Sequence, residues 1–416
     1  MFTARSISLL LLLATPAWAG AQTTQPPAST PAQTPPPETR AEELRREREE
    51  KQKHLTPQQP NAVESAINLA EKKAMPFLQR DGVYAKLGSL TTSSGFAYGA
   101  GFRNRRLFNR HGTGDVWAAG AINHYWAVEG RMSYTPNPNG IVTVDGFIRR
   151  VHYPREEFFG VGPDSQRANR SDYKTSGVGS GVGVTVRPTK KFSVGGNVDY
   201  LTPRIGPGTA GDIPTTQTLF DETTAPGLDQ KANFLRTAAF VQFDTRVPIN
   251  ARRGGWYGIQ FDNYDDRTTG DFSFRMTQLE FRQYVNFLSE RRVLAFRGWL
   301  ATTDVNSGEQ IPFYLMPSLG GNTTLRGFRA LRFRGPNAML LQAEYRFEIW
   351  AGLDAALFYD TGKVTDRRAD LNFKSLEHDY GIGFRFNTDQ GVILRIDAAF
   401  GSSDGRHLNI VFGSVF

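Results

Sequence analysis

Cysteine is missing from this chain of 416 residues, and histidine is scarce. Without cysteine no disulfide can form, so burial and backbone pairing alone must hold the fold. The six histidines show no spacing typical of metal ligands: His54, His111, His124, His152, His378 and His407. We therefore expect neither a bound metal nor a cofactor.

The sequence also lacks the motifs of common metalloproteases and nucleotide-binding enzymes. No HExxH or GxxxxGKS/T motif occurs, and the stretch GVGSGVGV at 177–184 lacks the GxGxxG spacing of dinucleotide-binding proteins. That stretch is better explained as a strand with small residues on one face. An outer-membrane lipase or protease finds little support, because we expect no GxSxG nucleophile elbow and the Ser, His and Asp residues form no readable constellation. We expect a protein without enzymatic activity.

The apolar run at the N-terminus is too short to span a bilayer. It covers residues 7–14, follows Arg5 and precedes a small-x-small cleavage site (AWA) at residues 17–19. This combination is typical of a secretory signal peptide, which we assign to residues 1–19. The sequence therefore predicts an exported protein.

Two segments without a strand pattern are expected to follow the signal peptide. Residues 20–37 form a Pro-rich linker, and residues 38–79 form a charged and amphipathic helical segment. The apolar face of that segment is weak, and it consists of Val63, Ala66, Ile67 and Ala70. A role as a plug for a barrel and a role as a plain spacer both stay open.

The excess of positive charge is modest. Lys and Arg number 49 against 41 Asp and Glu, which gives a formal net charge of +8. These basic residues are spread evenly along the chain, which argues against a dedicated nucleic-acid patch. We expect no nucleic-acid partner.

From about residue 82 to the end, apolar and polar residues alternate with the period of a β-strand. In residues 338–350 the apolar set is Met339, Leu341, Ala343, Tyr345, Phe347 and Ile349. The polar set of the same segment is Gln342, Glu344, Arg346 and Glu348. Sixteen such segments occur, at 83–90, 95–104, 114–123, 125–135, 140–152, 172–187, 190–204, 232–247, 254–266, 272–287, 291–304, 338–350, 352–364, 379–388, 392–401 and 407–416.

The connections between these segments alternate in length from the fifth segment on. The long ones lie at 153–171, 205–231, 305–337 and 365–378. The tight ones include 187–191 and 387–391. A membrane barrel with short periplasmic turns and long outer loops explains this alternation and requires an even strand number. The predicted fold class is all-β, a closed 16-stranded antiparallel transmembrane β-barrel over residues 80–416, with the N-terminus periplasmic.

The expected last strand carries an aromatic C-terminal signal. Phe412 and Phe416 share a face with Leu408 and Ile410. An open strand edge in lipid would leave backbone groups without partners, so we expect this strand to close the barrel. The alternative is a large exported, water-soluble β-sandwich or barrel, which the aromatic last strand disfavours.

The connection before the twelfth expected strand contains LGGNTTLRGF at residues 319–328. Gly320 and Gly321 permit backbone conformations closed to other residues, and the Asn-Thr-Thr that follows supports a tight turn. Arg326 stands at the tip, flanked by apolar side chains that are poorly placed in water. We expect this segment to fold inward against a partner surface.

With this segment before its twelfth strand, the chain resembles the bacterial surface antigen family, the outer-membrane insertion and secretion barrels typified by BamA, TamA and the transporters of two-partner secretion. Leu325-Arg326-Gly327-Phe328 matches the (V/I/L)RGF tip of that family. Further matches are FFGVG at 158–162, AEYRFE at 343–348, FYDTGKV at 358–364 and YGIGFRFNTDQGVILRIDAAF at 380–400. The resemblance covers about residues 82–416.

The resemblance implies that acids on the twelfth and thirteenth strands hold Arg326, and the matching residues are Glu344 and Asp360. The alternation of side chains independently places both acids on the inward face. A guanidinium that forks hydrogen bonds to two carboxylates would fix the loop inside the lumen. The expected loop lock is Arg326, Gly327, Phe328, Glu344 and Asp360, with Gly320 and Gly321 in its turn.

The family also implies a place in the outer membrane of a Gram-negative-type bacterium and a role in inserting or translocating proteins through a lateral seam. Expected partners are outer-membrane lipids, client proteins and the machinery that assembles barrels, including this one. Family members usually carry POTRA modules, and residues 20–79 cannot hold one. A passive outer-membrane pore or a structural surface antigen without transport activity therefore stays open as the alternative.

Overall fold

The computed structural model describes residues 50, 80–137, 139–246, 252–350, 352–388 and 391–412. The expected signal peptide, linker and helical segment lie outside the described residues, except for Glu50, and so does Phe416. The chain divides into two compact units, Met1–Gln59 and Pro60–Phe416. All the described strands belong to the second unit.

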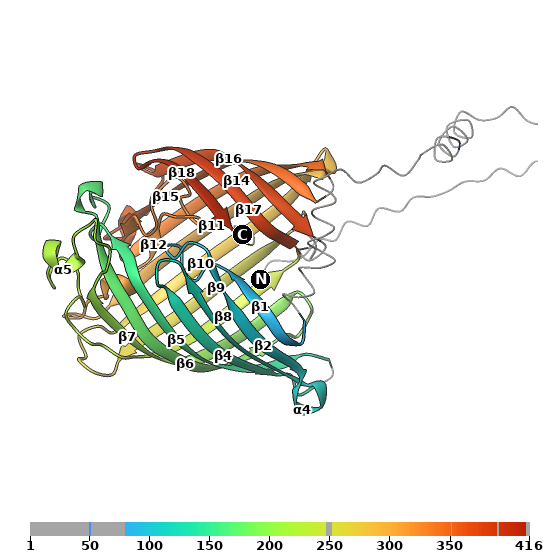
Figure 1. Cartoon of the computed structure of the whole chain (residues 1–416), viewed down its shortest axis with the longest axis horizontal. Coiled ribbons are helices and arrows are strands. Elements are labelled where there is room, and N and C mark those ends of the chain that lie inside the picture. Colours follow the sequence, from blue (N-terminus) through green and yellow to red (C-terminus); the bar gives the residue numbers. More distant parts are fainter. Residues whose placement is uncertain are drawn as a thin grey trace, which may run out of the picture. The chain divides into compact units, whose positions relative to one another are not determined.

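Sixteen strands of the second unit form one antiparallel sheet that curls into a nearly closed barrel (Figure 1). They are β1 (Gly82–Gly88), β2 (Ala97–Arg106), β3 (Gly112–Ala121), β4 (Trp126–Tyr134), β5 (Val142–Phe158), β6 (Ser171–Val186), β7 (Phe192–Pro207), β8 (Phe234–Asp244), β9 (Gly254–Asp266), β10 (Phe274–Phe287), β11 (Ser289–Val305), β14 (Asn337–Trp350), β15 (Leu353–Thr365), β16 (Glu377–Thr388), β17 (Gly391–Ser402) and β18 (Gly405–Val411). Each strand pairs with the next one in this series. The two-residue strands β12 (Ser318–Leu319) and β13 (Phe333–Arg334) form a small separate sheet.

The all-β, 16-stranded architecture predicted from the sequence is confirmed, with two corrections. The fifth strand, β5, continues to Phe158 instead of ending near residue 152, because its ladder with β6 resumes after a bulge between Tyr153 and Glu156. The sheet is nearly closed rather than closed. Within the described residues, β1 and β18 form the two edges of the sheet and share no ladder.

The two faces of the sheet differ in polarity. On β16, Tyr380, Ile382 and Phe384 are 53%, 52% and 42% exposed, whereas Asp379 and Arg385, which alternate with them, are buried. The same alternation recurs on the other strands and leaves many large apolar side chains exposed on one face. A membrane barrel turns its apolar face outward and its polar face toward the lumen, and this pattern matches that arrangement.

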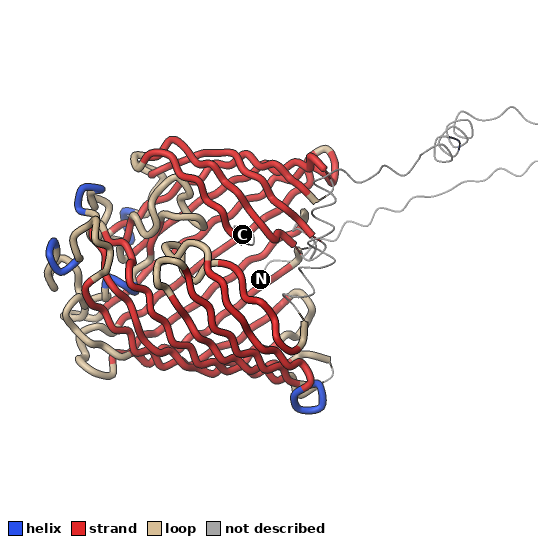
Figure 2. The backbone as a smooth tube through the Cα atoms, viewed as in Figure 1, coloured by secondary structure: helices blue, strands red, loops and turns tan. Residues whose placement is uncertain are grey.

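The connections give the barrel two different ends (Figure 2). Long connections follow β5, β7, β11 and β15 at the end called here the long-loop end. Shorter ones follow β2, β4, β6, β8, β10, β14 and β16 at the opposite, short-turn end. Among residues 80–412, the described helical elements are single turns: α4 (Leu107–Arg110), η2 (Arg167–Asn169), α5 (Thr216–Leu219), η3 (Phe313–Leu315) and η4 (Arg368–Asp370). None of the described helices is long and apolar enough to cross a membrane.

Candidate functional site

The connection between β11 and β14, residues 306–336, carries the candidate site and is named the β11–β14 loop. It contains η3 and the paired short strands β12 and β13. Four of its apolar side chains form a buried cluster with residues of β14 and β15: Leu319, Leu325, Phe328, Phe333, Ala338, Leu340 and Val364. Removing these side chains from water stabilises the position of the loop on the two strands.

A tight turn at Gly320 and Gly321 brings the tip of the loop back toward the strands. Both glycines have positive φ values, 109° and 94°, which residues with a Cβ rarely adopt. A Cβ on Gly320 would also lie 2.2 Å from the carbonyl oxygen of Arg329. Within the turn, the Gly320 amide donates to the Thr324 hydroxyl at 2.9 Å and the Gly321 amide donates to the Leu325 carbonyl at 3.1 Å. Glycine is therefore required at both positions.

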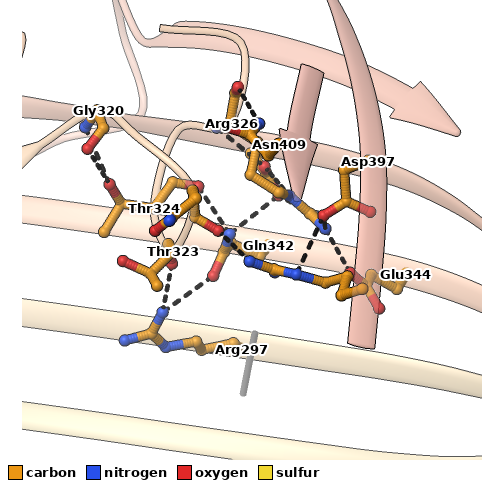
Figure 3. Close-up of polar contacts among 12 residues, drawn as sticks. Arg297, Gly320, Thr323, Thr324, Arg326, Gln342, Glu344, Asp397 and Asn409 are labelled. Atoms are coloured by element: carbon orange, nitrogen blue, oxygen red, sulfur yellow. Dashed lines mark hydrogen bonds and ion pairs between the residues drawn. The ribbon is translucent and has the colours of Figure 1, made fainter. Parts of the chain in front are cut away.

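Arg326 is fully buried between the carboxylates of Glu344 and Asp360, and that of Asp397 lies 3.6 Å from its Nη1. Figure 3 labels Arg326 with Glu344 and Asp397. Its Nε and Nη2 donate to the two oxygens of Asp360 on β15, at 2.6 and 2.7 Å. Its Nη1 donates to Oε1 of Glu344 on β14, at 2.5 Å. The guanidinium carbon lies 3.6 Å from the centre of the Phe358 ring, so the cation also stacks on an aromatic face. The planar fork of an arginine fits this arrangement, whereas lysine offers only a point charge.

Further arginines surround the same carboxylates. Arg385 of β16 donates to Glu344 at 2.8 Å and to Asp397 of β17 at 2.5 Å. Arg346 of β14 donates to the second oxygen of Glu344 at 2.6 Å. Glu344 therefore accepts hydrogen bonds from three arginines, counting Arg326. These bonds offset the desolvation of a carboxylate that would otherwise be costly to bury.

The two carboxylates keep Arg326 charged. Burial by itself would lower the pKa of the guanidinium, but the neighbouring Asp360 and Glu344 raise the pKa of Arg326 above its ordinary value. The side chain therefore remains a cation at any physiological pH. Deprotonation of the arginine is excluded as a way to release the loop.

The backbone of the loop tip contacts the last three strands of the sheet. The Asn409 side chain of β18 donates to the carbonyl oxygen of Arg326 at 3.0 Å, and the Ser402 hydroxyl at the end of β17 donates to that of Gly327. A Cβ added to Gly327 would lie 2.6 Å from the Cβ of Asp379 on β16. Together with the side-chain bonds of Arg326, these contacts join the tip to every strand from β14 to β18.

The base of the loop has a second set of polar anchors. Arg332 donates to the hydroxyl and the backbone oxygen of Ser165, both at 3.0 Å, in the connection after β5. Asp404, buried in the turn between β17 and β18, accepts from the backbone amide of Arg329 at 3.1 Å and lies 3.4 Å from the Arg332 guanidinium. The loop is therefore bound at both its tip and its base.

The structure brings five of the residues expected from the sequence into one group: Arg326, Gly327, Phe328, Glu344 and Asp360. Phe412 lies apart from this group, directly after β18. It is 42% exposed, and its ring centre is 5.2 Å from that of Phe96. Phe416, the other residue of the expected C-terminal signal, is outside the described residues.

Several side chains of the site were not expected from the sequence: Arg346, Asp379, Arg385, Arg395, Asp397 and Asn409. The alternation of apolar and polar residues along the strands could have placed them on the inward face. Asp379 and Arg385 alternate with the exposed Ile382, and Asn409 lies between the exposed Leu408 and Ile410. The alternation does not give their height along the barrel, which decides whether they reach the loop tip.

Contrary to the expectation of no GxSxG elbow, residues 401–405 (GSSDG) match the GxSxG pattern of serine hydrolases. The pattern marks a nucleophile only on a sharp turn from a strand into a helix. Here it joins β17 to β18, and its Asp404 binds the β11–β14 loop. The pattern therefore has a structural role. The described residues also contain no group of three or more potential metal ligands.

Comparisons with known proteins give a consistent result. A family model described as the Omp85 superfamily domain matches residues 117–414. No curated protein matches the chain. The crystal structure of BamA from Haemophilus ducreyi lacking POTRA domains 1–3 is similar with a TM-score of 0.58 and 14% identity, over 84% of this chain and 78% of that one.

CdiB from Escherichia coli is similar with a TM-score of 0.54 and 13% identity. The match covers 80% of this chain and 62% of CdiB, so the chain spans less than two thirds of that protein. At these identities the two structural similarities concern the fold alone.

Proposed function

Because the chain belongs to the Omp85 superfamily, we propose that it assists the insertion of proteins into the outer membrane or their translocation across it. The family match supports this role at that coarse level, as does the fold shared with BamA and CdiB. Barrels of this superfamily are outer-membrane proteins, and the match indicates no catalytic family. The proposed partners are client proteins. We also propose that the N-terminus of this chain lies on the periplasmic side of the membrane.

The observation that carries the mechanism is the burial of Arg326 against the strands that end the sheet. Its partners Glu344 and Asp360 lie on the face opposite to the exposed apolar side chains, so we place the loop tip inside the barrel. There the loop narrows the lumen and holds β14 to β18 as one body. We name Arg326 with these two carboxylates the Arg326 clamp.

The seam between β1 and β18 is the proposed place of client contact. An edge strand offers unpaired backbone groups, to which an extended client segment can add as a further strand. Asn409 connects this seam to the Arg326 clamp, because its side chain binds the carbonyl oxygen of Arg326. A displacement of β18 would therefore strain or break a contact at the clamp.

A reconstitution experiment tests the proposed function. The purified full chain is placed in phosphatidylcholine vesicles and mixed with an unfolded outer-membrane protein, whose folding is followed by its resistance to protease. We expect faster client folding than in empty vesicles. An equal rate in both kinds of vesicle would contradict the proposal.

The same assay tests the Arg326 clamp. Arg326→Ala should lose most of the acceleration, whereas Arg131→Ala, which removes the ion pair of a half-exposed arginine on β4, should keep it. The folded state of each variant is checked by its heat-dependent electrophoretic mobility. If a folded Arg326→Ala accelerates client folding as well as the wild type does, the clamp has no part in the mechanism.

A passive pore is the second candidate, and one cavity favours it. This cavity of about 320 Å³ lies against β4 to β8 and is lined in part by Arg131, Asp145, Asn197, Asp199 and Arg236. A polar, charged lining suits water and ions. Steady conductance in planar bilayers, combined with no acceleration of client folding, would favour the pore over the insertion role.

A further inference from the structure

Basic side chains gather at the short-turn end of the barrel, although they are spread evenly along the sequence. The up-and-down topology brings the turns after β2, β6, β8 and β10 to this one end. Nine exposed bases lie in these turns or within four residues of them: Arg105, Arg106, Arg110, Arg187, Lys190, Lys191, Arg253, Arg291 and Arg292. We name them the basic collar. The even spread of bases along the sequence had disfavoured a basic patch, because spacing along the chain does not show which turns meet at one end of the barrel.

Acids do not balance the basic collar. Among the described residues of the same four turns and their flanks, Glu290 is the only exposed acid. Ion pairs with more distant acids involve two of the nine bases: Arg105 with Asp81 at 3.6 Å and Arg291 with Glu348 at 3.9 Å. The collar therefore carries a strong local excess of positive charge.

The long-loop end shows no such excess. In its four long connections and their flanks, the described residues include five exposed bases: Arg167, Lys231, Arg367, Arg368 and Lys374. Six exposed acids occur in the same segments: Asp164, Asp212, Asp221, Asp229, Asp304 and Asp366. The charge asymmetry is thus a property of one end rather than of the whole surface.

Exposed apolar side chains accompany the bases. Phe108 is 55% exposed in the turn after β2, Phe192 is 37% exposed beside the turn after β6, and Leu288 is 79% exposed in the turn after β10. Bases interleaved with exposed apolar side chains are typical of surfaces at the boundary between lipid headgroups and acyl chains. An acidic soluble protein would match the charge but would leave the apolar side chains unexplained.

We propose that the basic collar binds the headgroups of anionic phospholipids in the leaflet next to the short-turn end. Each Lys or Arg near an anionic membrane surface adds attraction, and the four turns and their flanks hold nine of them at one end of the barrel. The apolar side chains enter the acyl region beside the headgroups. The proposal requires that the barrel lies in a bilayer but not that it inserts clients, so the two ideas can fail separately.

Two tryptophans serve as probes of the two ends. Trp350 ends β14 at the short-turn end and is 44% exposed, and Trp126 begins β4 at the long-loop end and is 37% exposed. Full-length variants that keep one of these tryptophans, with the others replaced by Phe, are reconstituted in mixed bilayers. Quenching by brominated phosphatidylglycerol is compared with quenching by brominated phosphatidylcholine.

We expect phosphatidylglycerol to be preferred over phosphatidylcholine at Trp350 by about twofold or more at low salt, and not at Trp126. The preference should fall as salt screens the charges. Equal quenching by the two lipids at Trp350, in the single-tryptophan variant that keeps all nine bases of the collar, would overturn the proposal.

Charge-removing variants complete the test. The collar variant replaces Arg253, Arg291 and Arg292, the collar bases closest to Trp350 in the strand order, by Gln, and the matched control replaces Lys231, Arg367 and Arg368. Only the collar variant should lose the preference at Trp350. If it fails to fold, R291Q/R292Q at the start of β11, next to β14, carries the test. A preference that survives in the folded collar variant and at high salt would contradict the proposal.

Discussion

Two walls of the barrel use the same ion-pair chemistry in different surroundings. On the β14–β18 wall, the side chains of Arg326, Glu344 and Asp360 are 0% exposed. On the wall formed by the first strands, Arg131 and Glu129 pair at 3.2 Å, and the arginine side chain is 55% exposed. In the first group the guanidinium and both carboxylates are shielded from water, whereas in the second the guanidinium of Arg131 is in contact with water and only the carboxylate of Glu129 is largely buried, at 11% exposure.

The comparison shows that water access, rather than the number of ion pairs, decides what each pair contributes. A buried charge that loses its partner stays desolvated, so each partner becomes indispensable. An exposed charge is solvated whether or not it is paired, and its pair contributes little. The predictions below either sharpen this contrast or break it.

The largest effect is expected from Arg326→Ala. It leaves the buried Glu344 and Asp360 without their shared cation, which should lower the free energy of unfolding by about 3–5 kcal/mol. Urea unfolding in lipid vesicles, followed by tryptophan fluorescence, measures the change. Arg326→Lys keeps the charge but not the forked hydrogen bonds, so its free energy of unfolding should lie between those of the wild type and Arg326→Ala. A loss no larger than that of an exposed pair would break the contrast.

A smaller effect is expected from Gly327→Ala, which tests the fit of the loop tip. The added Cβ would lie 2.6 Å from the Cβ of Asp379 and 3.3 Å from that of Ser402, so the tip must shift. Overpacking of this kind costs about 1–3 kcal/mol. Gly211→Ala, where nothing lies within 4 Å of the added Cβ, is the matched control and should leave the urea midpoint unchanged. Equal midpoints for both variants would contradict a tightly packed tip.

A gain in stability is expected from Asp379→Asn. Asp379 lies directly opposite Asp360 in the β15–β16 ladder, and both are buried. Like charges at directly opposite positions destabilise a sheet, so the change should raise the free energy of unfolding by about 0.5 kcal/mol. Thermal unfolding at neutral pH measures it. A marked loss of stability would show that the Asp379 carboxylate is needed as an anion.

The smallest effect is expected from Arg131→Ala. Arg131 is solvated whether or not it is paired, and Glu129 keeps Arg149 as a second cation at 3.8 Å, so the loss should be about 0.5 kcal/mol or less. The same urea experiment used for Arg326→Ala gives a direct comparison. A loss of several kcal/mol would mean that this wall is as dry as the other.

Much of the fold could be predicted from the sequence because strand alternation and loop length are local signals. The segment 254–266, for example, has the bounds of β9. The end of β5 could not be predicted, because the bulge near Tyr153 interrupts the alternation. Whether the first and last strands pair depends on contacts between opposite ends of the chain, which no local pattern contains.

The candidate site could be predicted in part. The tip motif and the alternation together pointed to Arg326, Glu344 and Asp360, and the structure brings these residues together. The partners Asp397 and Asn409 were missed, although the alternation placed them inward, because their height relative to the loop depends on the register and tilt of four further strands. Strand register and tilt follow from the three-dimensional structure and not from a local sequence pattern.

A double-mutant cycle between Arg326 and Asp360 tests most directly whether the loop is held by a desolvated clamp. Urea unfolding is measured for Arg326→Ala, Asp360→Ala and the double variant, and the same cycle is run on Arg131 and Glu129. We predict a coupling free energy above about 2 kcal/mol for the first pair and below about 1 kcal/mol for the second. A coupling between Arg326 and Asp360 no larger than that of the exposed pair would contradict the account.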